Sequence, residues 1–273
     1  ESVGRSASSG GNARALVKGG WGFTSFNSFA NIKERLSLAI AQARSVGRSK
    51  SALAPVPPAV DTVPSGVAQN PVEIPLAEKK KLLDEYNEII WSVPQIQTSS
   101  IYYSDSRKKV IFLSSEGSYI TQERADVAIR LTAVAAKDGE VQQVGLSLGS
   151  RGDFNALKGL HAQVKEIAQK AVALLTAPQA KGGEYTVVLD PVLAGVFVHE
   201  AFGHLSESDF VYENDRMREI MVLGKQFGSE KLNIVDSAAE PGLRGSFKYD
   251  YEGTLAVKTY LISQGKLVGR LHS

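Results

Sequence analysis

The residues best suited to chemistry lie at positions 199–204, where the sequence reads His-Glu-Ala-Phe-Gly-His. Imidazole nitrogens are common zinc ligands, and a hydrolytic zinc site needs a nearby carboxylate that takes a proton from the bound water. His199 and His204 are therefore the predicted metal ligands. Glu200, directly after the first histidine, is the predicted general base.

The spacing of these two histidines is unusual. The common zinc-peptidase pattern places them four residues apart on a helix, whereas His199 and His204 are five apart and therefore about 140° apart around an ideal α-helix. A single π-helical turn would insert one residue and restore a shared face, with Gly203 as the residue best able to distort. Alternatively, the helix ends near Gly203 and His204 binds from the following loop.

A purely structural interpretation also stands. His199 would then be a hydrogen-bonded core histidine and His204 a positive charge at a helix C-terminus. The preceding residues, VVLDPVLAGVFV, favour the chemical interpretation. They predict a buried strand and then an apolar helix capped by Asp190 and Pro191, which would put charged groups at the margin of a core, where an unpartnered charge is costly.

Other polar residues are weaker candidates. Asp250 fits a turn carboxylate and Glu252 a solvated surface acid. His161 is predicted on the surface of a helix, and His272 on a terminal strand without a visible partner.

Composition limits the classes of function. The 273 residues are 43% hydrophobic and carry a net charge of +2, so no electrostatic footprint for direct nucleic-acid binding is present. No apolar run approaches the length of a membrane span, and the first residues lack the apolar core of a secretory signal, so we expect a cytoplasmic protein. The absence of cysteine excludes a cysteine zinc ligand within this chain. Glu1 in place of methionine and an abrupt final hairpin suggest a piece of a longer polypeptide.

Hydrophobic periodicity predicts an α+β fold, with a mostly antiparallel sheet packed by long helices. We expect an N-terminal domain over 1–180 with a Pro-rich connection at 54–75, and over 181–273 the motif helix and the start of a truncated β-rich domain. Further helices are expected over 28–46, 76–91, 156–176 and 215–226, with Lys79–Lys81 facing away from the core. Strands are expected over 14–27 in part, 96–104, 108–114, 118–124, 127–137, 140–149, 184–189, 231–237 and 255–272. Hairpin turns are expected at Asp105-Ser106, Glu116-Gly117, Asp138-Gly139 and Gln264-Gly265.

The stretch VVLDPVLAGVFVHEAFGHLSESD resembles the TldD/PmbA family of zinc peptidases, the "modulator of DNA gyrase" proteins, in its catalytic TldD-type branch. GGNARALVKGGWGFTSF and YDYEGTLAVKTYLISQGKLVGRLHS resemble other parts of the same family, the latter through its Asp-x-Glu-Gly-Thr loop at 250–254. The resemblance implies an N-terminal module in which His199 and His204 bind zinc and Glu200 is the base. It also implies cleavage of small or unfolded peptides, and pairing with a related TldD/PmbA-type subunit or with itself.

The third zinc ligand departs from that family, which supplies a cysteine from a C-terminal domain. Glu207 or Asp209 could substitute only if the chain folds back at once. Since a catalytic zinc normally has three protein ligands, residues 1–273 alone are expected to be an incomplete, inactive part of a peptidase. The alternative is a non-catalytic dimerisation or regulatory module of a peptidase or gyrase-modulating complex.

Overall fold

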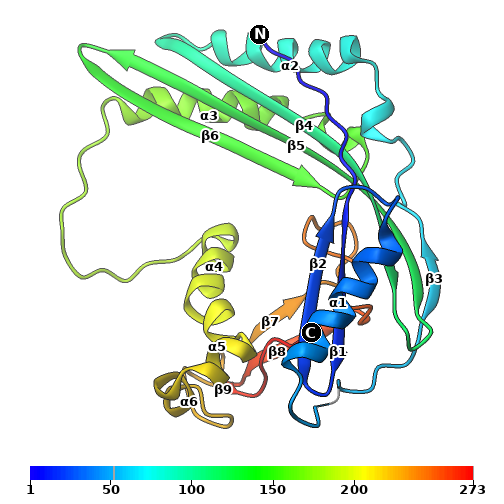
Figure 1. Ribbon diagram of the computed structural model, residues 1–273. Helices are drawn as coiled ribbons and strands as arrows, with labels where there is room; N and C mark the ends of the chain where they lie inside the picture. The colour runs from blue at the N-terminus through cyan, green and yellow to red at the C-terminus, as the bar shows by residue number, and fades with distance from the viewer. Residues whose placement is uncertain (52, 273) are drawn as a thin grey trace. The chain divides into compact units, whose positions relative to one another are not determined.

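The computed structural model describes residues 1–51 and 53–272, and the chain divides into two units, Glu1–Pro57 and Pro58–Ser273 (Figure 1). In the first unit, strands β1 (Gly11–Val17) and β2 (Gly20–Phe26) form an antiparallel hairpin beside helix α1 (Ile32–Val46). A Cβ atom at Gly22 would lie 1.8 Å from the carbonyl oxygen of Ala39. Glycine at this position therefore allows the strand to pack directly against the helix.

The second unit contains a long antiparallel hairpin, formed by β4 (Ile96–Leu113) and β5 (Tyr119–Lys137). Along its other edge, β5 pairs first with the parallel strand β3 (Val60–Val63) and then with the antiparallel strand β6 (Glu140–Ser150). Alternate residues of β5 are buried from Val127 to Ala135, so one face of the sheet is apolar. The α+β fold expected from the sequence is confirmed.

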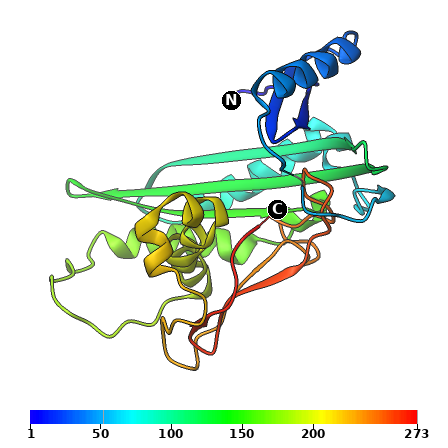
Figure 2. The ribbon, with the colours of Figure 1, turned by 60° about the horizontal axis from the view of Figure 1, so that its bottom comes forward.

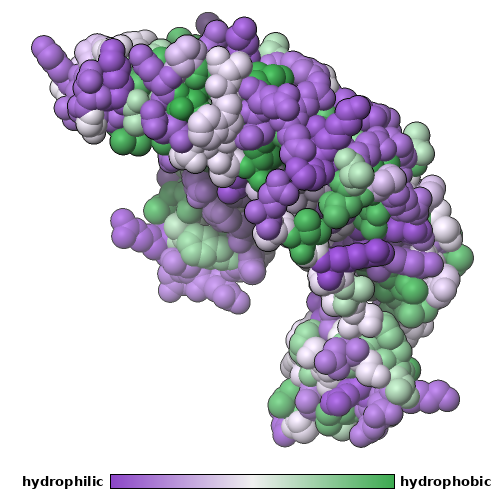
Figure 3. All heavy atoms as spheres, turned by 90° about the horizontal axis from the view of Figure 1, so that it is seen from above, coloured by the Kyte–Doolittle hydropathy of each residue, from purple (hydrophilic) through white to green (hydrophobic). Residues whose placement is uncertain are grey.

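Helices α2 (Leu76–Trp91) and α3 (His161–Leu174) cover that apolar face (Figure 1). Tyr86 is fully buried, and its hydroxyl donates to the carbonyl of Leu157 at 2.6 Å and accepts from the N–H of Leu160 at 3.2 Å. Leu157 ends a 3₁₀ turn, Phe154–Leu157, that precedes α3. The surface around α2, seen from above in Figure 3, is mainly hydrophilic, as an amphipathic helix requires.

The motif is carried by a run of short helices next to a small sheet. Helix α4 (Pro191–Val198) leads into a π-helical turn, His199–Gly203, and a 3₁₀ turn, His204–Ser206. Helices α5 (Ser208–Glu213) and α6 (Asp215–Ile220) follow, and then the antiparallel strands β7 (Ile234–Ser237), β8 (Lys258–Ser263) and β9 (Lys266–Leu267). These elements enclose a second core around Val211, Met221, Ile262 and Leu267.

The predicted hairpin turn at Asp105-Ser106 is wrong, because β4 continues through these residues and pairs there with β5. Polar residues there are satisfied across the sheet instead. Lys109 lies opposite Glu123, and Arg107 donates to the Glu123 carboxylate at 2.8 Å. Such cross-strand charge pairs stabilise a continuous antiparallel ladder. The turns at 116–117 and 138–139 are present as expected.

The orientation of Lys79 also differs from expectation. Its side chain does not face solvent but contacts the Asp105 carboxylate and the ring of Tyr103. The Tyr103 hydroxyl donates to Asp105 at 2.6 Å, and burial together with this neighbour raises the pKa of Tyr103. Helix α2 is thus joined to β4 by an ion pair that helical periodicity alone does not show.

Other element bounds were predicted only in part. Strand β3 lies inside the Pro-rich connection expected to be irregular, because Val60–Val63 pairs with β5. Residues 184–189 are not the predicted buried strand: Val188 is 98% exposed, and Figures 1 and 2 show 176–189 as an extended trace after α3. Among the helices of the described residues, none combines the length and hydropathy that a membrane crossing needs.

Candidate metal centre

Helix α4 begins as its sequence predicts. The Asp190 side chain accepts hydrogen bonds from the backbone N–H groups of Val192 at 2.8 Å and Leu193 at 3.0 Å. Pro191 occupies the first helical position, where its missing N–H costs nothing. This cap fixes where the helix starts, and hence which residues its last turn presents.

The transition from α4 to the π turn brings the two histidines together. The backbone N–H of His204 donates to the carbonyl of His199, a bond that spans five residues instead of four. The imidazole centroids are 4.5 Å apart, with the rings at 68° to one another. Of the two geometries that the spacing allowed, the π turn is the one adopted.

Apolar residues of the same run anchor it to the second core. Val198, Phe202 and Leu205 pack against that core, and the Phe202 ring meets the ring of Phe227 edge to face at 5.4 Å. His199, Glu200 and His204 are exposed. The apolar contacts therefore hold the helix while the polar residues of the motif remain accessible.

His199, Glu200 and His204 form a group whose ligand atoms all lie within 4.8 Å of one another. Two imidazoles are ligands that zinc accepts, and a carboxylate beside them can take a proton from bound water, so this group fits the metal suggested by the motif. Within the described residues, the group contains neither Glu207 nor Asp209. The less favoured option, that one of these acids replaces the third ligand, therefore has no support in the geometry.

Gly203 does not have the role expected for it, which was to let the backbone distort. Its φ of −55° and ψ of −63° are ordinary right-handed values, available to any L-residue. A Cβ atom there would lie 3.6 Å from Nδ1 of His199, a normal van der Waals distance. The π turn thus does not depend on the conformational freedom of glycine.

Sequence reasoning did not identify the neighbour of His204. Its Nδ1 lies 2.8 Å from Oε1 of Glu207, three residues later. The signal that could have revealed the contact is the i, i+3 spacing, which places two side chains next to each other on a helical turn.

The weaker candidates lie apart from this group. The Asp250 carboxylate accepts from the backbone N–H groups of Glu252 and Thr254, both at 2.8 Å, and so serves as a turn residue. His161 bonds to Glu85 at 2.6 Å on the helix surface. His272 does have a partner, contrary to expectation, because its Nδ1 lies 3.0 Å from the hydroxyl of Ser208.

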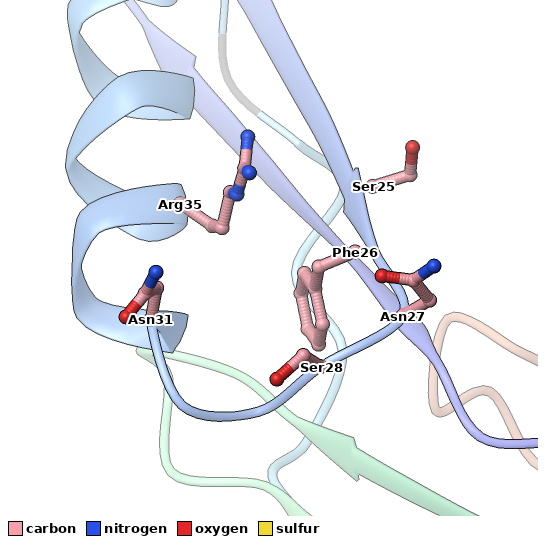
Figure 4. A pocket seen from close by; sticks show the side chains of 6 residues that line it. All are labelled: Ser25, Phe26, Asn27, Ser28, Asn31 and Arg35. Carbon is pink, nitrogen blue, oxygen red and sulfur yellow. The ribbon is translucent and has the colours of Figure 1, made fainter.

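A surface recess of about 430 Å³ lies in the first unit, between the end of β2 and the start of α1 (Figure 4). The side chains shown there are Ser25, Phe26, Asn27, Ser28, Asn31 and Arg35. These six residues include no histidine and no carboxylate. The recess therefore lacks the groups that metal-assisted hydrolysis needs.

Comparison with known proteins agrees with the motif. Three family models match the chain: PmbA/TldA metallopeptidase domain 1 over residues 1–46, the central domain over 69–175 and the C-terminal domain over 182–273. The chain belongs to the TldD/PmbA family. A metalloprotease from Synechocystis is 45% identical over 276 residues, covering 100% of this chain and 59% of that protein.

Two further comparisons extend this result. A zinc metalloprotease TldD homolog from Saccharolobus solfataricus is 28% identical over 176 residues, covering 64% of this chain and 39% of that protein. The crystal structure of a putative modulator of a DNA gyrase from Thermotoga maritima has a TM-score of 0.70 at 17% identity, covering 96% of this chain and 59% of that one. Compared with the Synechocystis metalloprotease described above, this TldD/PmbA chain spans about three fifths of that protein's length.

Proposed function

We propose that this TldD/PmbA chain carries the metal-binding and proton-transfer groups of a zinc-dependent peptidase that cleaves small or unfolded peptides. The observation that supports the proposal most directly is the π turn, since it gathers His199, Glu200 and His204 into a group with ligand atoms within 4.8 Å. Membership of a metallopeptidase family supports the reaction class. In this proposal residues 1–180 form the N-terminal domain, and 181–273 carry the motif helix and the start of a β-rich domain.

The residues of the motif would divide the work in a simple way. Imidazole nitrogens of His199 and His204 would hold the ion. Bound zinc supplies Lewis acidity, which polarises the scissile carbonyl and lowers the pKa of its coordinated water. A carboxylate oxygen of Glu200 accepts a proton from the attacking water and passes it to the leaving amine.

A third protein ligand is part of the proposal, because catalytic zinc sites normally have three. We assign it to a cysteine outside residues 1–273, so these residues alone would be inactive. A cytoplasmic location belongs to the same proposal.

The decisive test uses the protein together with the proposed third ligand. In Glu200→Gln, zinc content should be unchanged, while peptide cleavage should fall by roughly 10²–10⁴-fold because the general base is lost. In His199→Ala, both zinc and cleavage should be lost. Glu213→Gln, an exposed acid at the end of α5, is the matched control. Full activity in Glu200→Gln would remove the enzymatic proposal.

One observation favours a second function, in subunit interaction. Exposed apolar side chains are concentrated between residues 185 and 197, on the extended trace and on α4: Tyr185, Val187, Val188, Leu189, Val192, Leu193, Val196 and Phe197. Many exposed apolar side chains in one segment are typical of interaction sites. We propose that it docks on a related TldD/PmbA-type subunit or on a second copy, without direct contact to nucleic acid.

This second function has its own test. Val192→Asp should weaken assembly, as measured by analytical ultracentrifugation, because it places a charge in an apolar interface. Tyr102→Asp, on an exposed position of β4, is the control. Unchanged assembly in Val192→Asp would exclude this surface as the contact.

A further inference from the structure

We propose that Glu207 is a positioning residue for the metal centre: its carboxylate accepts a hydrogen bond from Nδ1–H of His204 and so directs the lone pair of Nε2 toward the metal. The inference rests on the proposed zinc function of His204. It assigns to Glu207 a role that differs from direct metal ligation.

The contact indicates which tautomer a neutral His204 ring adopts. Oε1 of Glu207 lies 2.8 Å from Nδ1 of His204. An ionised carboxylate can only accept, whereas a neutral imidazole has one N–H and one lone pair. The proton of neutral His204 must therefore be on Nδ1, which leaves Nε2 as the ligand atom. Metal-binding histidines are commonly oriented by a carboxylate on the opposite nitrogen.

The backbone on both sides of Glu207 is fixed by the end of the chain. The N–H of Leu271 donates to the carbonyl of Ser206 at 2.8 Å, and the N–H of Ser208 donates to the carbonyl of Leu271 at 3.0 Å. Ser206 and Ser208 are both buried. Glu207 therefore has little backbone freedom to lose when its side chain engages the ring.

The local turn brings the two side chains together. The N–H of Glu207 donates to the carbonyl of His204 at 3.3 Å, closing the 3₁₀ turn His204–Ser206. Residues three apart lie on the same side of such a turn. The π turn thus brings His204 to His199, and the following 3₁₀ turn brings Glu207 to Nδ1 of the His204 ring.

Metal affinity measures the effect of this contact. Replacing the carboxylate behind a ligating histidine typically weakens metal binding by about 10–100-fold. We expect a loss of that size for zinc in Glu207→Ala, measured by competition with a chromogenic chelator. Glu207→Gln should recover part of the affinity, because its amide oxygen can accept the same hydrogen bond without the charge.

The tautomer of His204 provides a readout that needs no metal. Long-range ¹H–¹⁵N spectra of metal-free protein at about pH 8.5, where an ordinary histidine is neutral, should show His204 protonated on Nδ1. In Glu207→Ala this preference should be lost. A purely structural role for Glu207 would leave the tautomer unchanged.

Asp209→Asn is the matched control, because it removes a nearby negative charge whose carboxylate contacts its own neighbour, the N–H of Phe210. Its zinc affinity should equal that of the parent chain. The inference is overturned if Glu207→Ala keeps both the Nδ1–H tautomer and the parent affinity, or if Asp209→Asn loses as much affinity. His204→Ala separates the two proposals: unchanged zinc affinity there would remove the zinc site and this inference together, whereas a loss confined to His204→Ala would remove only the role of Glu207.

Discussion

The backbone N–H of His204 donates to the carbonyl oxygen of His199, five residues earlier in the chain. In a regular α-helix this donor would reach Glu200, and the two imidazoles would project about 140° apart. With the longer turn, the ring centroids are 4.5 Å apart. A single backbone hydrogen bond therefore determines whether the two histidines can share one ion.

Replacing Gly203 by alanine tests whether this turn needs glycine. The backbone of Gly203 is right-handed, and the side-chain atoms nearest to an added methyl group would be those of His199, at normal contact distance. Zinc affinity should be unchanged, and urea denaturation should show stability unchanged or raised by up to about 1 kcal/mol.

Gly253→Ala is the contrasting control. Gly253 has a φ of +82°, and its added Cβ would lie 2.5 Å from the Phe112 ring, so this variant should be destabilised. Loss of zinc in Gly203→Ala with the fold retained would show that glycine is required in the turn.

Tyr86→Phe should destabilise the second unit by about 1–3 kcal/mol, because it leaves the carbonyl of Leu157 and the N–H of Leu160 buried without their hydroxyl partner. Chemical denaturation followed by circular dichroism measures the change. The exposed Tyr102→Phe should be neutral. Equal stability of both variants would mean that the hydroxyl of Tyr86 contributes nothing.

The Asp61–Lys248 pair should respond to acid. The pKa of Asp61 is lowered mainly by a hydrogen bond from the Lys248 ammonium and, to a smaller extent, by one from the Tyr249 hydroxyl. Because the pKa of this carboxyl is lower in the folded protein than in the unfolded chain, where it is about 3.9, the pair stabilises the fold at pH values above the unfolded pKa. This contribution is lost as the pH falls through the lower pKa of the folded state. Lys248→Met should therefore raise the pKa of Asp61 toward its ordinary value in an NMR titration, and Lys81→Met should not. An unchanged Asp61 pKa in Lys248→Met would contradict this assignment.

Local signals predicted the elements that depend on local structure. The helix over 76–91 and the Asp190–Pro191 cap match the structure because periodicity and capping act within a few residues. The predicted strand at 184–189 failed, since an apolar run forms a strand only where another strand pairs with it. Among the described residues, no strand includes it.

Long-range contacts explain the rest of the difference. The ion pair of Lys79 with Asp105 joins residues 26 positions apart, and helical periodicity does not encode it. At the metal centre, the spacing of His199 and His204 left two geometries open. The structure adopts the π turn, in a run whose apolar residues, Phe202 among them, pack on the second core. The contact of Glu207 with His204 was within reach of the sequence through its i, i+3 spacing.

Deleting Ala201 tests whether a shared helix face is sufficient for the site. The motif then reads His-Glu-Phe-Gly-His, the spacing of the common zinc-peptidase pattern. A π turn contains one residue more than an α turn, so the deletion should restore a regular helix in which Val198 and Leu205 keep their packing on the second core. The histidines would then lie about 40° apart, and zinc should still bind.

Inserting a second alanine after Ala201 instead rotates the second histidine by about 100°, and zinc affinity should fall to that of His204→Ala. Chelator competition measures both, with circular dichroism as the check on folding. A folded deletion variant has both histidines on one helix face. If it binds no zinc, a shared face is not sufficient, and the site needs the particular geometry of the π turn.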